Sequence, residues 1–361
     1  MLDLNQLLAH VTEVGGSDLH VKAGSPPRVR VNGDLRPAPF GNIEPKDVEE
    51  VLRLIMPADR IEEFHRTGEA DFSLSAPNLG RFRGNAFRQR GTAAMVLRRV
   101  LPAAIAAVDL GLPPVVTRIA EEQRGMVLVT GPTGSGKTTT LAAMIDHINQ
   151  TRAANIITIE DPIEILHPDK RSIISQREIG NDTRDYAQAM RRVLRQDPDV
   201  ILIGEMRDIE TVAAALTAAE TGHLVLSTLH TTNATETINR IVDFFPPFQQ
   251  DQIRLTLAGV LRGVVSQRLV PRADGEGRAP AIEAMVVTGR IADRIIDPKS
   301  AGESIEELIA EGEYHGMQTF DQSLFGLFKS GAVTLRAALS AATNAHDFRL
   351  ALQNAGLLPA G

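Results

Sequence analysis

The 361-residue sequence predicts an α/β protein of two or three domains, the largest of which is built on a mainly parallel sheet. Four short apolar runs after Gly125 (GMVLVTG, NIITIED, DVILIGE and HLVLSTLH) are separated by helical stretches, the pattern of a parallel sheet covered by helices on both faces. Before residue 100, alternating segments separated by turn residues predict an antiparallel sheet. An apolar content of 43% is typical of a soluble globular protein with sizeable cores.

Each part of the chain has its own pattern. Residues 1–100 combine one amphipathic helix with short alternating segments separated by Asn32-Gly33 and Asn78-Leu79-Gly80, which predicts a small α+β domain. The stretch LPAAIAAVDLGLPPVV holds three prolines, so residues 101–124 are interpreted as a linker. Residues 125–290 carry the alternating strands and helices of the core. Residues 291–361 are helical by period, most clearly in SIEELIAEGE and TLRAALSAATNAHDFRLALQNAG.

Composition and charge restrict the classes of partner. The formal charge of −7 argues against nucleic acid, because binding a phosphate backbone needs a basic face. Aromatic residues make up 4% and tryptophan is absent, so no base-stacking surface is expected. The absence of cysteine excludes disulfides and thiolate metal sites and fits a reducing cytosol. The N-terminus does not resemble a secretion signal, and no run approaches the ~18 apolar residues of a membrane span, so any contact with a membrane is expected to be peripheral.

The segment GPTGSGKT matches the phosphate-binding loop pattern G-x-x-x-x-G-K-S/T at each fixed position, between the strand MVLVT and the helix TTTLAAMIDHIN. The glycines let backbone N–H groups turn toward phosphate oxygens, and the helix N-terminus adds its dipole. Lys137 is expected to reach the β- and γ-phosphates, and the Thr138 hydroxyl to bind Mg²⁺. A glycine-rich turn that merely resembles the motif is the competing interpretation. The sequence therefore predicts a site for a nucleoside triphosphate at Gly131, Pro132, Thr133, Gly134, Ser135, Gly136, Lys137, Thr138 and Thr139.

Acidic residues follow two of the predicted strands: Glu160, Asp161 and Glu164 after the strand IITI, and Glu205 after VILI. Ligands gather outside the carboxyl ends of parallel strands, where both groups project. Hydrolysis needs one group to orient or deprotonate water and another to hold the water shell of the metal. Alone, either group would be a solvated strand end, but a complete phosphate loop at the same edge favours the functional interpretation.

Two histidines flank a further predicted strand. His230, at its carboxyl end, can sense the γ-phosphate by hydrogen bonding, and a structural histidine at a sheet edge is the alternative. His223, at the other end beside Thr221-Gly222, is explained equally well by a structural hydrogen bond at a helix stop. The N-terminal domain also carries a run of arginines, which is usually a solvated strand face or protects a sheet edge: Arg81, Arg83, Arg88, Arg90, Arg98 and Arg99.

Together these motifs resemble the secretion ATPases that power type IV pili and type II secretion. IITIEDPIE resembles the Asp box of that superfamily, VILIGEMRD its Walker B segment ending in glutamate, and TGHLVLSTLHT its His box. Within the superfamily the chain is most similar to the PilT family of type IV pilus retraction ATPases, nearly end to end. GGSDLHVKAGSPPRVRVNGDL resembles the N-terminal signature of that family, and GMQTFDQSL resembles its C-terminal signature.

The resemblance implies a PAS-like N-terminal domain and a RecA-like ATPase core with ATP and Mg²⁺ as ligands. It implies that Glu205 is the general base or orients the water, and that Glu164 helps to place the water. Glu160 and Asp161 are possible substitutes for Glu164, and either could also hold the metal through water. In that family two arginines of the N-terminal domain contact the γ-phosphate, and the matching positions are Arg83 and Arg98. They would neutralise transition-state charge in the manner of an arginine finger.

The resemblance also implies a homohexamer on the cytoplasmic, inner face of the cytoplasmic membrane. This ring would pull pilin out of the fibre, with an inner-membrane platform protein as its partner. Three alternatives stay open: a pilus-assembly or type II secretion ATPase, a nucleic-acid motor with a similar core, and a nucleotide-binding regulator without turnover. The sequence departs from the family after the core. Members of the family often carry a short helix signature similar to AIRNLIRE, whereas this chain has RIADRIIDPKSAGESIEELIAEGE at the corresponding place.

Overall fold

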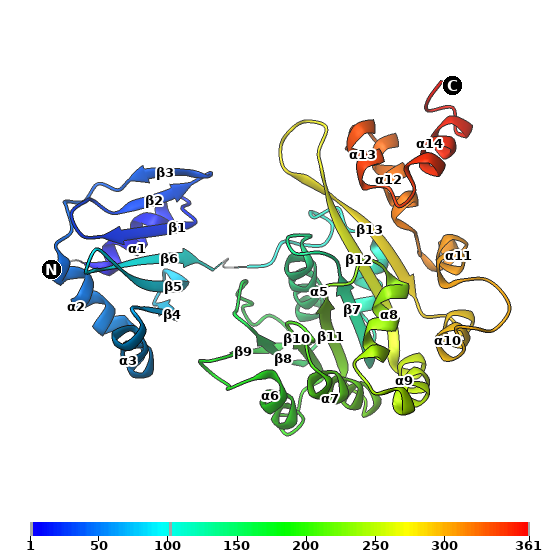
Figure 1. Cartoon of the computed structure of the whole chain (residues 1–361), viewed down its shortest axis with the longest axis horizontal. Helices are drawn as coiled ribbons and strands as arrows, with labels where there is room; N and C mark the ends of the chain where they lie inside the picture. The colour runs from blue at the N-terminus through cyan, green and yellow to red at the C-terminus, as the bar shows by residue number, and fades with distance from the viewer. Residues whose placement is uncertain (1–2, 101–102, 360–361) are drawn as a thin grey trace. The chain divides into compact units, whose positions relative to one another are not determined.

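The computed structural model describes residues 3–100 and 103–359, and it divides into two compact units. The first unit comprises Met1–Ala103 and Glu164–Leu166, and the second comprises Ala104–Ile163 and His167–Gly361. Each unit is labelled by element in Figure 1. The predicted α/β class is confirmed, because an antiparallel sheet with helices is followed by a mostly parallel sheet and a helical C-terminal part.

Among its described residues, the first unit forms a six-stranded antiparallel sheet in the order β3-β2-β1-β6-β5-β4. Asn32-Gly33 closes the hairpin of β2 and β3 with φ angles of 50° and 88°, as a two-residue turn with positive φ requires. Arg90-Gly91 closes the hairpin of β5 and β6 in the same way. The strands are β1 (Asp18–Lys22), β2 (Arg28–Val31), β3 (Asp34–Pro37), β4 (Glu69–Ala76), β5 (Gly80–Gln89) and β6 (Thr92–Arg99).

Three helices supply the core of the first unit: α1 (Leu4–Glu13), α2 (Pro45–Ile55) and α3 (Ala58–Thr67). Their apolar faces pack with alternate strand residues, including Leu19, Phe82 and Leu97, which are fully buried. Because side chains alternate along a strand, the residues next to these three project from the opposite face of the sheet. The second face therefore carries Asp18, Arg83 and Arg98.

In the described part of the second unit, a seven-stranded sheet runs in the order β13-β12-β7-β11-β10-β8-β9. The pairs from β12 through to β9 are parallel, and β13 is antiparallel to β12. The four predicted apolar runs form β7 (Gly125–Thr130), β8 (Asn155–Glu160), β10 (Val200–Ile203) and β11 (Leu224–Leu229). Three strands were not predicted: β9 (Ile173–Glu178), β12 (Leu261–Pro271) and β13 (Arg278–Val286).

Helices pack on both faces of this sheet (Figure 1). On one face, α4 (Pro114–Ala120) and α5 (Lys137–Thr151) enclose a core with Val127 and Val129 of β7. On the other face, a second core contains Met126 and Leu128 of the same strand. The helices on that face are α6 (Tyr186–Val193), α7 (Ile209–Glu220), α8 (Ala234–Asp243), α9 (Pro247–Val260), α10 (Gly289–Ile296) and α11 (Ile305–Ala310).

The segment predicted as a linker, residues 101–124, contains α4. Val115, Val116 and Ile119 of this helix are buried in the core beside α5, so it packs as part of the second unit. Pro113 and Pro114 stand at the N-cap and first position of the helix, where a missing N–H costs nothing. Residues 101–102 of the predicted linker lie outside the described residues.

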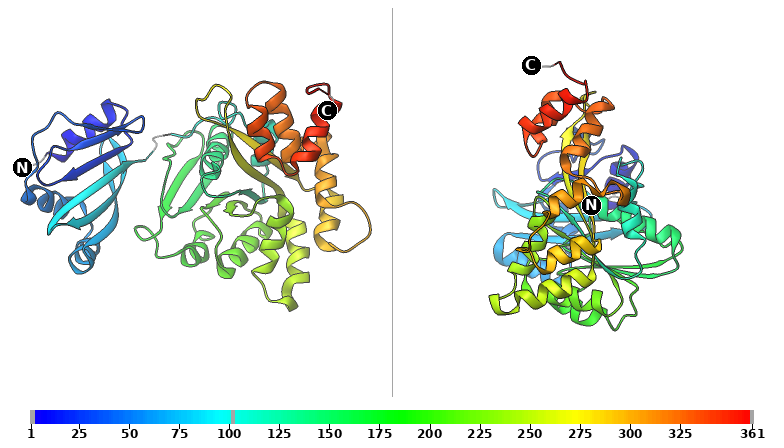
Figure 2. Two further views of the ribbon diagram at one scale, coloured as in Figure 1. Left: turned by 45° about the horizontal axis from the view of Figure 1, so that its top comes forward. Right: turned by 90° about the vertical axis from the view of Figure 1, so that its right-hand side faces the viewer.

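The chain ends in helices that pack against the far end of the β12–β13 hairpin. A separate core joins Val270 and Ala281 of the hairpin to Phe320, Leu324 and Phe348. Both views in Figure 2 place these orange and red helices at that end of the yellow strands. They are α12 (Phe320–Lys329), α13 (Leu335–Ala341) and α14 (Ala345–Asn354), preceded by a short 3-10 helix, Gly312–His315. Among the described residues, no helix has both the length and the apolar character needed to cross a membrane.

Candidate nucleotide site

The predicted phosphate loop joins β7 to α5, which is the strand–loop–helix context on which the prediction depends. Gly131, Gly134 and Gly136 have positive φ angles of 141°, 76° and 93°. A Cβ atom at Gly131 would lie 2.4 Å from the carbonyl oxygen of Gln267, and one at Gly136 would lie 2.7 Å from Gln267 Nε2. The backbone of β12 therefore leaves no room for a side chain at Gly131. At Gly136 the near atom ends a flexible side chain, and the positive φ angle is what favours glycine.

Lys137 begins α5, and its ammonium group turns back onto the loop. Its Nζ donates to the carbonyl oxygens of Gly131 at 2.8 Å and Pro132 at 3.1 Å. Burial lowers the pKa of this ammonium group, and the nearby Glu205 carboxylate opposes that effect. The first N–H groups of an α-helix have no partner within the helix, so those of Lys137, exposed Thr138 and half-buried Thr139 remain for a ligand. Ammonium and backbone donors together suit phosphate.

Glu205 follows β10 after Gly204, and 19% of its side chain is exposed. Nη2 of Arg207 donates to Glu205 Oε2 at 2.7 Å, Nε of Arg207 contacts Oε1, and His230 Nε2 lies 3.7 Å from Oε2. Burial raises the pKa of the Glu205 carboxyl, but the Arg207 hydrogen bonds and the charges of Arg207 and His230 outweigh burial and hold this pKa below its ordinary value. Glu205 is therefore ionised at neutral pH, as a base must be.

Hydrogen bonds join the ends of neighbouring strands beside Glu205. Thr228 Oγ1 donates to the Gly204 carbonyl at 2.7 Å, and the Gly204 N–H donates to the Ile159 carbonyl at 2.8 Å. Met206 N–H donates to the Thr228 carbonyl at 3.2 Å. The chain on both sides of Glu205 is thus attached to β8 and β11, which fixes the direction of its side chain.

The two adjacent acids after β8 differ in environment. Glu160 is buried, and its Oε1 accepts hydrogen bonds from Thr158 Oγ1 at 2.6 Å and Gln176 Nε2 at 3.0 Å. Asp161 is exposed. Burial raises the pKa of the Tyr186 hydroxyl, and the negative charges of Asp161 and Glu205 raise it further. Asp161 and Glu205 therefore both lie near the Tyr186 hydroxyl. Of the two predicted metal-shell acids, Asp161 is the one accessible to water.

The two histidines have different surroundings. His230 follows β11, is half exposed and faces Glu205. The hydroxyl groups of Thr231 and Thr237 lie 2.7 Å apart and attach the loop after His230 to α8. His223 Nδ1 lies 3.0 Å from the Ala218 carbonyl and 3.2 Å from Thr221 Oγ1, in the turn before β11. For His223 these contacts favour the structural interpretation.

The remaining predicted residues lie in the first unit. Arg83 and Arg98 are directly opposite on β5 and β6, so they share the sheet face that the helices leave open. Glu164, half exposed, has its Oε1 3.9 Å from Arg83 Nη1, and Arg98 Nε donates to Asp18 Oδ1 at 2.7 Å. Arg88 projects to the helix face instead, where it contacts Glu49 and lies 4.8 Å above the ring of Phe64.

A family model for type II/IV secretion system proteins matches residues 2–313. The chain belongs to this family. It is 44% identical over 347 residues to the type IV pilus retraction ATPase PilT of Pseudomonas aeruginosa, covering 96% of this chain and 100% of that one. It is 40% identical to the type IV pilus ATPase PilU of the same organism, over 98% of this chain and 92% of PilU. A crystal structure of the pilus retraction motor PilT with bound ADP matches with a TM-score of 0.86 at 43% identity, over 96% of this chain and 99% of that one.

The resemblance to the PilT family predicted from the motifs is thus confirmed. Three site residues of this secretion system protein were nevertheless missed. Tyr186 lies against the backbone at Gly204, since a Cβ there would be 2.8 Å from its hydroxyl, and Arg207 holds Glu205. Gln267 forms the floor of the phosphate loop and accepts a hydrogen bond from Thr140 Oγ1 at 2.8 Å. Arg207 was visible as the only cation in GEMRD, whereas Tyr186 and Gln267 carry no motif.

The residues present fit a Mg²⁺-bound nucleotide. The Ser135 hydroxyl is buried and has no hydrogen-bond partner among the described residues, so the loop holds an unused polar group for a ligand. The described residues contain no group of three or more His, Asp or Glu side chains that could hold a metal ion. Mg²⁺ commonly needs few protein ligands when phosphate oxygens supply the rest. Thr138, the second residue of α5, is in position to be one such ligand.

Proposed function

We propose that this protein is an ATP-hydrolysing motor that drives type IV pilus retraction as a homohexamer. The observation that carries the proposal is the 44% identity to a retraction ATPase over 96% of this chain and the whole of the relative. Assembly and secretion ATPases of the superfamily often carry a four-cysteine zinc module, whereas this chain contains no cysteine. This absence favours retraction over the opposite mechanical output.

In the proposed cycle, Lys137 leaves the carbonyl oxygens of Gly131 and Pro132 and binds the β- and γ-phosphates of ATP. Thr138 and the phosphates would hold Mg²⁺, with Glu160 or Asp161 as further partners through water, and the ion would neutralise phosphate charge. Glu205, ionised and held by Arg207, orients or deprotonates the attacking water. His230 lies 3.7 Å from Glu205 and is placed to sense the γ-phosphate.

The first unit would complete the site. Arg83 and Arg98 share one sheet face and would neutralise charge on the γ-phosphate, while Glu164 beside Arg83 would help to place the water. A site built from separate domains or subunits favours a closed ring, because heterologous contacts are satisfied when the ring closes. We place this ring in the cytoplasm at the inner face of the cytoplasmic membrane, with an inner-membrane platform protein as its partner.

The test is to delete the gene and to count surface pili and surface motility, with complementation by wild type and by Lys137→Ala. Abundant pili on immobile cells, restored to normal by wild type alone, are the expected result. Cells without pili would show that the motor builds the fibre, which is the assembly alternative. Normal pili and motility would contradict both outputs.

A further inference from the structure

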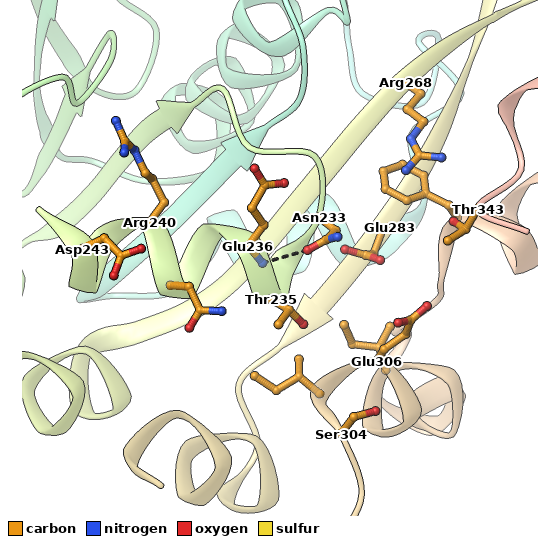
Figure 3. Close-up of a pocket in the computed structure, with 14 residues that line it drawn as sticks. Asn233, Thr235, Glu236, Arg240, Asp243, Arg268, Glu283, Ser304, Glu306 and Thr343 are labelled. Atoms are coloured by element: carbon orange, nitrogen blue, oxygen red, sulfur yellow. Dashed lines mark hydrogen bonds between the residues drawn. The ribbon is translucent and has the colours of Figure 1, made fainter. Parts of the chain in front are cut away.

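A cavity of about 630 Å³ lies in the second unit (Figure 3), and its described lining residues do not include those of the phosphate loop. It opens to the surface and is lined by α8, the strands β12 and β13, α11 and the start of α12. Its volume lies in the range of cavities that bind small molecules or inserted side chains. We call it the acidic pocket. The residues of α11 that line it belong to the segment in which the sequence departs from the helix signature of the retraction family.

Six of the fourteen described residues that line the acidic pocket carry a charge. Its two cations are already engaged, because Arg268 lies 3.9 Å above the ring of Phe320 and Arg240 lies 4.8 Å above the ring of Phe244. Arg268 also donates to the Ala341 carbonyl at 2.8 Å. When all four carboxylates are ionised, they leave a net charge of −2 against the two guanidinium groups. The carboxylates are Glu236, Asp243, Glu283 and Glu306.

Glu283 is the most buried of these acids, with 5% of its surface exposed. It projects from β13, and its Oε1 accepts a hydrogen bond from the Ala234 N–H at 2.7 Å. Burial raises the pKa of the Glu283 carboxyl to about 7, and the negative charge of Glu306 adds to the rise, while the Ala234 N–H, the charge of Arg268 and the Ser266 hydroxyl oppose it. A buried carboxylate beside a second one is costly to ionise unless a cation approaches.

Apolar side chains line the same pocket beside the acids. Ile305 and Ile309 of α11 and the ring of Phe320 form this apolar surface. Lysine and arginine bury their methylene stems along apolar surface while their charged ends meet carboxylates. We propose that the acidic pocket is a docking site for a lysine or arginine side chain of a partner polypeptide, with Glu283 and Glu306 as the groups that receive its charge.

The docking site is connected to the candidate nucleotide site through the backbone. Ala234, whose N–H is held by Glu283, is the first residue of α8, and His230 lies four residues before it. A basic side chain that binds the Glu283 carboxylate therefore competes with the Ala234 N–H for it, and so affects the segment between His230 and α8. The docking itself does not depend on ATP turnover, so it is measured without nucleotide, and its failure is distinguishable from failure of the proposed function.

The first test is binding of a fluorescein-labelled peptide of alternating alanine and lysine or arginine to the full chain, followed by fluorescence anisotropy at pH 8. We expect Glu283→Gln to weaken binding about tenfold, because it removes one partner of a buried charge pair, and Glu306→Gln to weaken it a few-fold. Glu313→Gln is the matched control, since Glu313 is exposed and lies outside the pocket, and it should bind like wild type. The same peptide with glutamate in place of the basic residues should not bind.

The second test is the pH dependence of this binding. The charged groups around Glu283 are Arg268 on β12, Glu306 on α11, and Glu236, Arg240 and Asp243 on α8. Binding should weaken from pH 8 to pH 6 in wild type, as Glu283 takes up a proton, and this loss should be absent in Glu283→Gln. Equal peptide affinity for wild type, Glu283→Gln and Glu306→Gln would overturn the proposal. So would an absence of peptide binding together with a change of oligomeric state in Glu306→Gln, since a second copy would then be the occupant.

Discussion

Asp18 and Arg98 lie directly opposite each other on β1 and β6, and Arg98 Nε donates to Asp18 Oδ1 at 2.7 Å. The two side chains of this ion pair differ in exposure, because 6% of the Asp18 side chain is exposed and 67% of the Arg98 side chain. Burial raises the pKa of the Asp18 carboxyl, but Arg98 and the Ser17 hydroxyl outweigh burial and hold this pKa below its ordinary value. Arg98, which the proposed mechanism brings to the γ-phosphate, is thus also the partner of a buried carboxylate.

Replacing Arg98 is therefore expected to have two separable effects. Arg98→Ala should destabilise the protein by about 2 kcal/mol, because it removes a hydrogen bond to a buried charged group, and should lower ATP turnover at least about 10³-fold if the arginine acts as a finger. Asp18→Asn in the same chain should restore most of the stability and none of the turnover. Urea unfolding and steady-state ATPase assays measure the two effects. Arg36→Ala, an exposed arginine at the sheet edge, is the control.

Recovery of turnover in the Asp18→Asn, Arg98→Ala double variant would contradict a role for Arg98 at the phosphate. It would show instead that the loss in the single variant came from the uncompensated Asp18 carboxylate.

Glu205→Gln tests the assignment of the base. Glutamine keeps the size of the side chain but cannot accept a proton, so ATP turnover should fall about 10²- to 10³-fold while nucleotide binding persists. Steady-state turnover and binding of a fluorescent ADP analogue separate the two quantities. Glu210→Gln is a matched control, since Glu210 is exposed on the following helix and pairs with Arg191. Turnover unchanged by Glu205→Gln would remove this residue from the mechanism.

The sequence predicted those strands whose residues are buried on both faces. Val200–Ile203 and Leu224–Leu229 are buried throughout, so they are recognisable as uninterrupted apolar runs. The edge strand β9 reads IISQRE and is largely half-exposed, which removes this signal. In β12, polar Ser266 and Gln267 are fully or nearly buried, and hydrogen bonds from Thr130 and Thr140 satisfy their side chains. These partners are distant in sequence, so the local sequence of β12 does not predict a buried strand.

The site was predictable where motif and strand order suffice. The phosphate loop, Glu205 and His230 follow three strands that are adjacent in the sheet, so their proximity follows from the topology. The pairing of Asp18 with Arg98 depends on strand register, and which of Arg83 and Arg88 faces the helices depends on where the alternation begins. Neither can be fixed by composition. The hydroxyl of Tyr186 reaches Gly204 from α6, a contact that only tertiary packing creates.

Glu283 makes stability depend on pH with a defined sign. Its pKa is raised from 4.5 to about 7 in the folded state, so the folded protein holds a proton that the unfolded chain releases. This contribution is fully present below pH 4.5 and is lost as the pH rises through 7. The unfolding free energy of wild type should therefore fall, relative to Glu283→Gln, by about 3 kcal/mol between pH 4.5 and pH 7. Urea titrations across this range measure it, with Glu313→Gln as the control, and parallel profiles would contradict the assignment.

His167 should act in the opposite direction over nearly the same range. Burial lowers the pKa of its imidazole from 6.5 to about 4, with Asp146 opposing and Lys170 reinforcing the shift, and its Nδ1 is buried without a hydrogen-bond partner among the described residues. The stability from keeping this ring neutral is present above pH 6.5 and is lost as the pH falls through 4. As the pH falls from 6.5 to 4, the unfolding free energy of His167→Gln should fall by about 3 kcal/mol less than that of wild type. His346→Gln, at an exposed histidine, should lose as much unfolding free energy as wild type. A His167→Gln profile as steep as that of wild type would show that another group causes the loss in acid.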